Sequence, residues 1–116
     1  MTQFSFSKDK RILKRKDFIR LSKQGKKVFT DYFIAIVTQG AENNNRIGIT
    51  ASKKVGNAPE RNRIKRLIRE NFRHRENNNL VTKDINIIAR KGIVSLSNKE
   101  INTELNRLFN KITKLY

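Results

Sequence analysis

The sequence contains no cysteine and no tryptophan, and only one proline and one histidine. The lack of cysteine excludes disulfides, thiolate zinc sites and thiol nucleophiles, and it fits a reducing cytosol. No apolar run approaches the length of a transmembrane span, and residues 1–11 lack the apolar segment of a signal peptide. We therefore expect a cytoplasmic protein that does not bind membranes.

Acidic residues are also scarce. Ten Asp and Glu residues stand against 27 Lys and Arg, which gives a net charge of +17 and a pI near 10.9. An excess of this size points to a polyanionic partner, first of all a nucleic acid. The length of 116 residues allows one domain, residues 1–116, with a modest core.

Groups that catalyse reactions are sparse as well. The only histidine, His74, lies among basic residues at the end of an expected helix, where it suits phosphate contact better than general-base catalysis. The aspartates are spread along the chain, whereas a two-metal nuclease needs clustered carboxylates. The segment GNAPERNR lacks the glycines and the Lys-Ser/Thr ending of a P-loop. We expect no catalytic residue and no metal site in this chain.

The apolar periodicity predicts the order helix, three strands, helix, strand, helix. The expected segments are a lead-in over 1–13, a helix over 14–24 stopped by Gly25, strands over 28–37 (broken at Thr30-Asp31), 46–52 and 84–90, and helices over 57–75 and from Ser97. Ser97 and Glu100 have the spacing of a capping box, and the last helix has an apolar stripe of Ile101, Leu105, Leu108, Phe109, Ile112 and Leu115. Residues 38–45, with three asparagines, are expected to form a hairpin loop. The predicted fold is α+β: a single-domain α/β sandwich with one mainly antiparallel sheet and helices packed on it.

The most informative segment is Lys53–Arg75, with nine basic and two acidic residues. Asn57 followed by Glu60 has the spacing of a capping box. Helical spacing gathers an apolar stripe of Ile64, Leu67, Ile68 and Phe72, and a different face with Arg61, Asn62, Lys65, Arg66, Arg69 and Arg73. A solvated charged face is the alternative, but such faces usually interleave acids with bases. This helix is therefore expected to bind a polyanion.

Four aromatic residues near the first helix and strands offer stacking faces to unpaired bases: Phe18, Phe29, Tyr32 and Phe33. Ordinary core packing is the alternative for each. For Phe29 and Phe33 we favour core packing, and for Phe18 both alternatives stay open.

Val55-Gly56-Asn57-Ala58, followed by the run from Arg61 to Glu70, resembles the arginine-rich signature of the bacterial ribonuclease P protein family. The resemblance extends to residues 16–18, 46–54 and 84–91. It implies a small subunit of a ribonucleoprotein endonuclease that removes the 5′ leader from precursor tRNA. Its partners would be the catalytic RNA and the leader, with no obligate protein partner. The RNA would hold Mg²⁺ and cleave the phosphodiester, and the protein would need no cofactor of its own. The implied fold has a left-handed βαβ crossover around the arginine-rich helix.

By position, the resemblance implies one set of residues at the catalytic RNA: Lys53, Lys54, Asn57, Arg61, Asn62, Arg63, Lys65, Arg66, Arg69 and Arg73. It implies a second set in a central cleft that receives the leader: Phe18 and Phe33, with Tyr32, Ile36 and Ser22 at neighbouring positions. Many family members have aromatic residues where this chain has Ser22 and Ile36. Further basic candidates are Lys14, Arg15, Arg90 and Lys91.

Two other functions also fit a basic chain. A stand-alone RNA-binding, ribosomal or RNA-chaperone protein would explain the charge but not the spacing of the signature. A protein-only nuclease would require the scattered carboxylates to converge.

Overall fold

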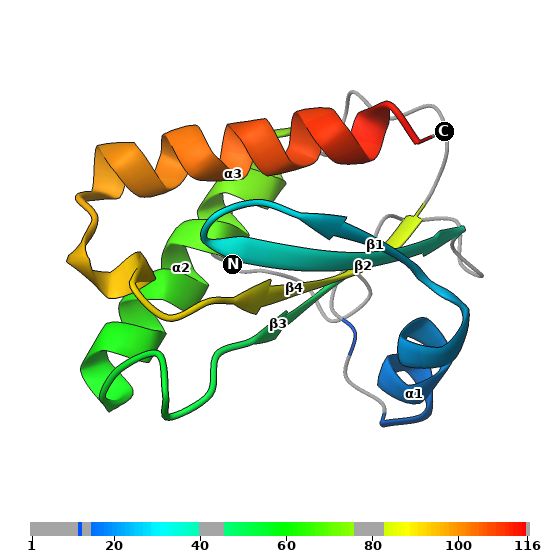
Figure 1. Cartoon of the computed structure of the whole chain (residues 1–116), viewed down its shortest axis with the longest axis horizontal. Helices are drawn as coiled ribbons and strands as arrows, with labels where there is room; N and C mark the ends of the chain where they lie inside the picture. Colours follow the sequence, from blue (N-terminus) through cyan, green and yellow to red (C-terminus); the bar gives the residue numbers. More distant parts are fainter. Residues whose placement is uncertain (1–11, 13–14, 40–45, 76–82, 116) are drawn as a thin grey trace, which may run out of the picture.

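The computed structural model describes residues 12, 15–39, 46–75 and 83–115 (Figure 1). Its elements are α1 (Arg15–Gln24), β1 (Lys26–Phe29), β2 (Phe33–Gln39), β3 (Arg46–Thr50), α2 (Ala58–Arg75), β4 (Lys83–Ala89), the 3₁₀ turn η3 (Ile93–Ser95) and α3 (Asn98–Thr113). This order confirms the predicted α+β arrangement. None of the described helices combines the length and the apolar character that crossing a bilayer requires.

The four strands form one sheet in the order β1-β2-β4-β3. The β1–β2 and β2–β4 pairs are antiparallel, and β3 pairs with β4 in parallel. The predicted hairpin between β2 and β3 is therefore wrong, because β4 lies between these strands; residues 40–45 themselves are outside the described residues. β4 takes the central position because nearly every residue in it is buried, so it needs a neighbour on each side.

The parallel strands β3 and β4 are connected through α2. In Figure 1 both arrows point to the left, β4 lies above β3, and α2 passes behind the sheet. A chain that follows this path makes a left-handed crossover, as the family resemblance implies. Most βαβ units are right-handed.

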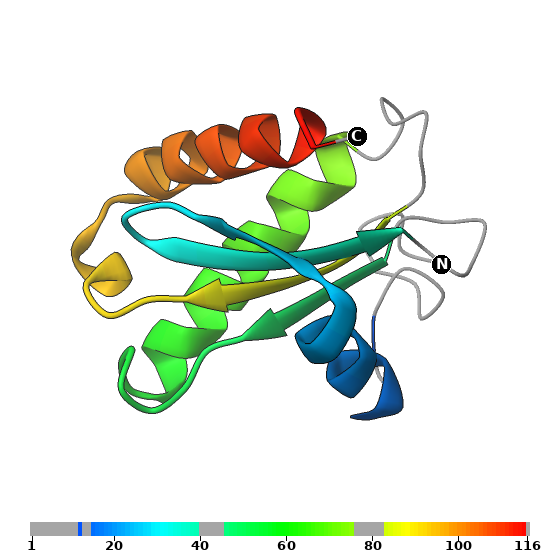
Figure 2. The same ribbon diagram turned by 45° about the vertical axis from the view of Figure 1, so that its right-hand side comes forward.

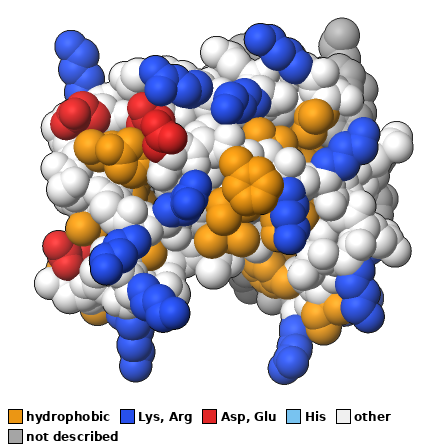
Figure 3. Space-filling view, in the orientation of Figure 1, with side chains coloured by type: hydrophobic (Ala, Val, Ile, Leu, Met, Phe, Trp, Pro, Cys, Tyr) orange, Lys and Arg blue, Asp and Glu red, His pale blue; other side chains and the backbone are white. Residues whose placement is uncertain are grey.

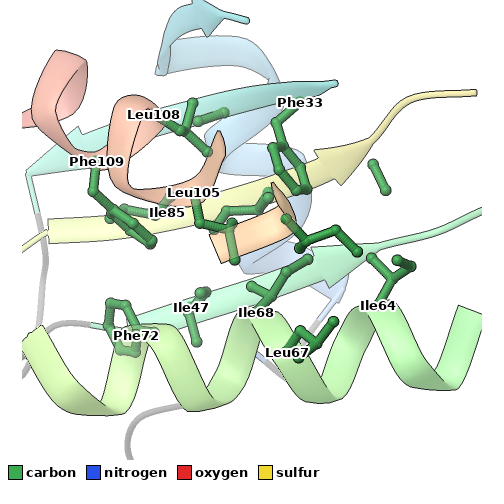
Figure 4. Packing of buried hydrophobic residues seen from close by; sticks show 14 of the residues in the cluster. Phe33, Ile47, Ile64, Leu67, Ile68, Phe72, Ile85, Leu105, Leu108 and Phe109 are labelled. Atoms are coloured by element: carbon green, nitrogen blue, oxygen red, sulfur yellow. The ribbon is translucent and has the colours of Figure 1, made fainter. Parts of the chain in front are cut away.

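The main core lies between the sheet and the helices α2 and α3 (Figure 4). The predicted stripe of α2 is buried there in full, and Phe72 meets Phe109 of α3 with ring centroids 6.1 Å apart. Alternate residues of the strands, such as Ile85 and Ile87, complete the cluster. The stripe of α3 is confirmed except at Leu115, which lies beyond the helix and is exposed.

Of the described helices, α1 alone lies on the opposite side of the sheet (Figures 1 and 2). Here a small cluster of Ile12, Leu21 and Ile36 is buried. Ile12 belongs to the expected lead-in, yet its N–H donates to the Ile47 carbonyl at 2.9 Å. Gly25 ends α1 as predicted, since a Cβ there would lie 2.4 Å from Ile36 Cγ2. Within the described ranges, the rest of this side is less covered than the side of α2 and α3, and it is the candidate binding surface.

Candidate nucleic-acid interface

α2 begins with the predicted capping box. The Asn57 N–H donates to Glu60 Oε1 at 2.8 Å, and the Glu60 N–H donates to Asn57 Oδ1 at 2.9 Å. Gly56 leaves room for this arrangement, because a Cβ there would lie 2.8 Å from Glu60 Oε1. Val55 is buried in the main core and anchors the segment before the helix. The cap thereby fixes the point at which the basic helix starts.

The predicted RNA-facing set divides by exposure. Its exposed members are Lys53, Lys54, Asn57, Asn62 and Arg66, and its half-buried members are Arg61, Arg63, Lys65, Arg69 and Arg73. Neither Lys65 nor Arg66 has a carboxylate partner in the described part of the chain, and the same holds for both lysines before the helix. These cations therefore keep their charge available for a phosphate.

Arg63 differs from the rest of this set, because its guanidinium binds the protein. Its Nε donates to Asn98 Oδ1 at 2.9 Å, its Nη2 to the Leu96 carbonyl at 2.7 Å and its Nη1 to the Val94 carbonyl at 3.4 Å. These bonds join α2 to the connection between η3 and α3. The prediction that Arg63 faces RNA does not agree with this geometry. Arg61 is also partly turned inward, with a buried Nε that has no partner among the described residues.

The further basic candidates do not gather at α2. Arg15 is exposed at the start of α1, and Lys91 is exposed after β4. Arg90 donates from Nη1 to the Thr30 carbonyl at 2.9 Å. Lys14 lies outside the described residues.

On the α1 side, Phe18 packs against β3 at Gly48. A Cβ on Gly48 would lie 2.6 Å from Phe18 Cε1, so only glycine lets the ring approach this closely. Phe18 is half-buried beside the small cluster, and it combines core contact with an accessible edge. Ser22 is exposed on α1, and Ile36 is buried beneath it in the sheet.

Phe33 and Tyr32 lie elsewhere. Phe33 is fully buried in the main core, and Tyr32 is half-buried against the same cluster. Strand alternation directs Phe33 toward α2 and α3, together with Ala35 and Val37. The prediction that Phe33 shares a cleft with Phe18 is therefore wrong. The favoured alternative of core packing is confirmed for Phe33.

Phe29 was expected in the core and is instead 55% exposed. Its neighbour Val28 is buried in the main core, so alternation places Phe29 on the α1 side of the sheet. The cross-strand register aligns it with Ile34 and then with Ile88. Figure 3 shows this side of the molecule: hydrophobic side chains gather near its middle, and Lys and Arg side chains surround them.

α1 is held on the sheet by a polar network that sequence reasoning missed. The fully buried carboxylate of Asp84 accepts from Arg46 Nε at 2.9 Å and from Arg46 Nη2 at 2.7 Å, and it also pairs with Arg20 of α1. Arg46 Nη1 lies 3.5 Å from Asp17 Oδ2. The hydrogen bonds from Arg46 to Asp84 raise the pKa of Arg46, against the lowering effect of burial. Aspartates that are distant in sequence thus serve to dock α1.

The described carboxylates are engaged within the fold or lie apart from one another. Within the described ranges, no three His, Cys, Asp or Glu side chains come together as metal ligands. The buried carboxylate of Asp84 is already occupied by two arginines. The cations of α2 and of the segment before it, by contrast, include exposed members without a described carboxylate partner, such as Arg66 and Lys53.

Comparison with known proteins agrees with this description. Residues 6–113 match the family model described as Ribonuclease P. The ribonuclease P protein component of Desulforapulum autotrophicum is 48% identical over 98% of this chain and 97% of its own length, and that of Legionella pneumophila is 42% identical over 97% of both. The structure of the Staphylococcus aureus ribonuclease P protein superposes with a TM-score of 0.82 at 39% identity, covering 90% of this chain and 95% of that one. The chain therefore belongs to the ribonuclease P protein family, whose members are protein components of a tRNA-processing ribonuclease.

Proposed function

We propose that this chain binds the catalytic RNA of ribonuclease P through the outer surface of α2, and the 5′ leader of precursor tRNA through the α1 side of the sheet. The observation that carries the proposal is the run of exposed cations at Lys53, Lys54 and Arg66, none of which has a carboxylate partner in the described part of the chain. Neutralising phosphates is the main source of affinity for nucleic acid.

The leader surface is supported by a different chemistry. The α1 side offers the half-buried Phe18 and the exposed Phe29, together with Ile34 and Ile88 in the same region of the sheet. Aromatic and apolar side chains receive unpaired bases by stacking, with little dependence on sequence. A single-stranded leader presents such bases, whereas a duplex keeps them stacked.

Cleavage itself is assigned to the RNA subunit, with Mg²⁺ as the cofactor held there. Divalent ions stabilise the charge that develops on the attacking and leaving oxygens of a phosphodiester. Among the described residues the carboxylates engage arginines or lie apart, and no three of them come together as ligands for such an ion. The part of the protein in the reaction is to assemble with the RNA and to hold the substrate.

Reconstitution tests this assignment. A bacterial ribonuclease P RNA is incubated with precursor tRNA at a low Mg²⁺ concentration, with and without the purified chain. We expect the chain to stimulate removal of the leader, and to cleave nothing when the RNA is omitted. Binding without stimulation of a cognate RNA would favour the stand-alone RNA-binding alternative. Cleavage by the protein alone would identify a protein-only nuclease.

The leader surface has its own test in Phe18→Ala. If Phe18 contacts the leader, the substitution lowers the affinity of the reconstituted enzyme for precursor tRNA more than for mature tRNA. Equal losses would mean that Phe18 acts only by packing on Gly48.

A further inference from the structure

A second basic site lies at the end of β1, at the turn into β2. A pocket of about 300 Å³ is lined there by Phe29, Thr30, Asp31, Arg90, Arg107 and Lys111. The last two residues come from α3, and Arg90 follows β4, so two distant segments converge on this turn. None of these segments carries the arginine-rich signature.

Two cations of this pocket, Lys111 and Arg90, are oriented by carbonyl oxygens that do not neutralise them. Lys111 Nζ donates to the Phe29 carbonyl at 3.1 Å, and Arg90 Nη1 donates to the adjacent Thr30 carbonyl at 2.9 Å. A carbonyl oxygen has no formal charge, so both cations keep theirs. Arg107 forms an ion pair with Glu104, with 3.4 Å between Nη1 and Oε2, but 58% of the Arg107 side chain is exposed. Asp31 is the only acid in the lining, and the pocket therefore attracts anions.

Phe29 gives the pocket an aromatic surface. Its 55% exposure is the largest of any large hydrophobic side chain described, and it lies on an edge strand beside the exposed Lys27. A phenyl ring in water gains nothing for the fold, whereas a nucleobase stacked on it is stabilised. The combination of an exposed ring with nearby cations is the chemistry that single-stranded nucleic acid requires.

We propose that this pocket binds one nucleotide of a single-stranded RNA, with the base on the Phe29 ring and the phosphate beside Arg107 and Lys111. A volume of about 300 Å³ is at the lower end of ligand pockets, which suits one nucleotide and not a duplex. A duplex also leaves no base face free for the ring.

The pocket lies at the β1 edge of the sheet, so its Phe29 adjoins the α1-side surface while its α3 residues come from the opposite side. The register aligns Phe29 with Ile34 and Ile34 with Ile88, so two strand spacings of roughly 4.8 Å each separate the ring from the middle of the sheet. A single-stranded RNA bound near Phe18 can therefore extend along the protein surface to the pocket. If that strand is the leader, Phe29 supplies a stacking ring that α1 lacks at Ser22; in this respect the inference rests on the proposed function.

The direct test is binding of a fluorescent uridine hexanucleotide to the purified chain, measured by anisotropy over a salt series. Phe29→Ala should lower the affinity about 5- to 150-fold at unchanged salt dependence, the range for losing one stacked base. Phe29→Tyr should retain the affinity, because the ring remains. Lys111→Ala should lower the log–log salt slope by roughly 0.7. Lys99→Ala, which removes an exposed cation of α3 outside the pocket, should leave the slope unchanged.

The inference is overturned if Phe29→Ala binds the hexanucleotide as tightly as the unaltered chain does. It is also overturned if Phe29→Tyr loses as much affinity as Phe29→Ala and urea unfolding shows that both variants are folded. The hexanucleotide assay contains no catalytic RNA. Failure of the chain to stimulate that RNA would therefore contradict the proposed function and leave this test intact.

Binding measurements with the reconstituted enzyme then identify the RNA that supplies the bound nucleotide. If the nucleotide belongs to the leader, Phe29→Ala weakens binding of precursor tRNA and spares mature tRNA. If it belongs to the catalytic RNA, the substitution weakens assembly of protein and RNA before any substrate is added. An unchanged affinity in both measurements would contradict a role for the pocket in this enzyme.

Discussion

Among the described residues, one cluster of 19 buried hydrophobic residues covers the sheet on the side of α2 and α3, whereas the hydrophobic cluster on the α1 side has three buried members, Ile12, Leu21 and Ile36. The first side is held by apolar packing between long helices. The second is held by a short helix and a network of Asp84 with two arginines. A side that is only partly covered keeps strand residues accessible, so it is the side on which a substrate strand can lie.

Phe33→Ala and Phe29→Ala give the sharpest contrast between the two sides. Phe33 is fully buried in the large cluster, so its truncation should cost about 3–5 kcal/mol of unfolding free energy. Phe29 is 55% exposed, and its truncation should change stability by no more than about 0.5 kcal/mol. Urea unfolding of both variants measures the difference. Similar losses would mean that the two rings share one environment.

Asp84→Asn tests how α1 is docked. The substitution removes a buried charge from between Arg20 and Arg46, and breaking such a pair should cost about 3 kcal/mol. Hydrogen exchange should show the loss first in the amides of α1, while α2 and α3 stay protected. Asp31→Asn, at an exposed aspartate, is the control. Uniform loss of protection across the chain would argue that the network supports the whole fold.

Arg63→Ala tests the division within the arginine-rich helix. Its three hydrogen bonds to Asn98, Leu96 and Val94 should make the substitution destabilising by about 1–3 kcal/mol. Arg66→Ala is the matched variant, since Arg66 is exposed on the same helix and should lose little stability. Thermal unfolding compares them. Equal stability of the two variants would contradict the structural role of Arg63.

The smallest effect is expected at the start of α3. Hydrogen bonds from Ser97, with the backbone N–H contributing most, lower the pKa of Glu100 below its ordinary value of 4.5. A lowered folded-state pKa means that this carboxylate stabilises the protein above pH 4.5, and that the contribution is lost as pH falls through the lowered value. Glu100→Gln should therefore reduce the acid dependence of the melting temperature, whereas the exposed Glu70→Gln should not. Identical pH profiles for Glu100→Gln and the unaltered chain would refute this.

The sequence predicts best what local spacing determines. The caps at Asn57 and Ser97 and the buried stripe of α2 follow from residues three or four positions apart, and the structure confirms them. Phe29 and Phe33 show the limit of prediction from local spacing. The break at Thr30-Asp31 is predicted, but the geometry of the turn is not, and it places the two rings on opposite sides of the sheet. The Phe33 N–H donates to Thr30 Oγ1 at 3.0 Å within that turn.

Contacts between distant segments could not be predicted either, because they depend on how those segments pack together. The pairing of Asp84 with Arg20 and Arg46 depends on β4 lying between β2 and β3, which no local pattern specifies. The inward turn of Arg63 likewise depends on where η3 and α3 dock. Helical spacing predicts which face a residue occupies, and the neighbouring segments decide whether that face is free.

The salt dependence of catalytic RNA binding tests the central claim most directly. If the outer surface of α2 contacts the RNA backbone, Arg66→Ala should lower the slope of log affinity against log salt by roughly 0.7 to 0.9, the value for one lost phosphate contact. Lys99→Ala, at an exposed cation of α3, should leave the slope as it is. An unchanged slope for Arg66→Ala would place Arg66 off the interface and contradict the account.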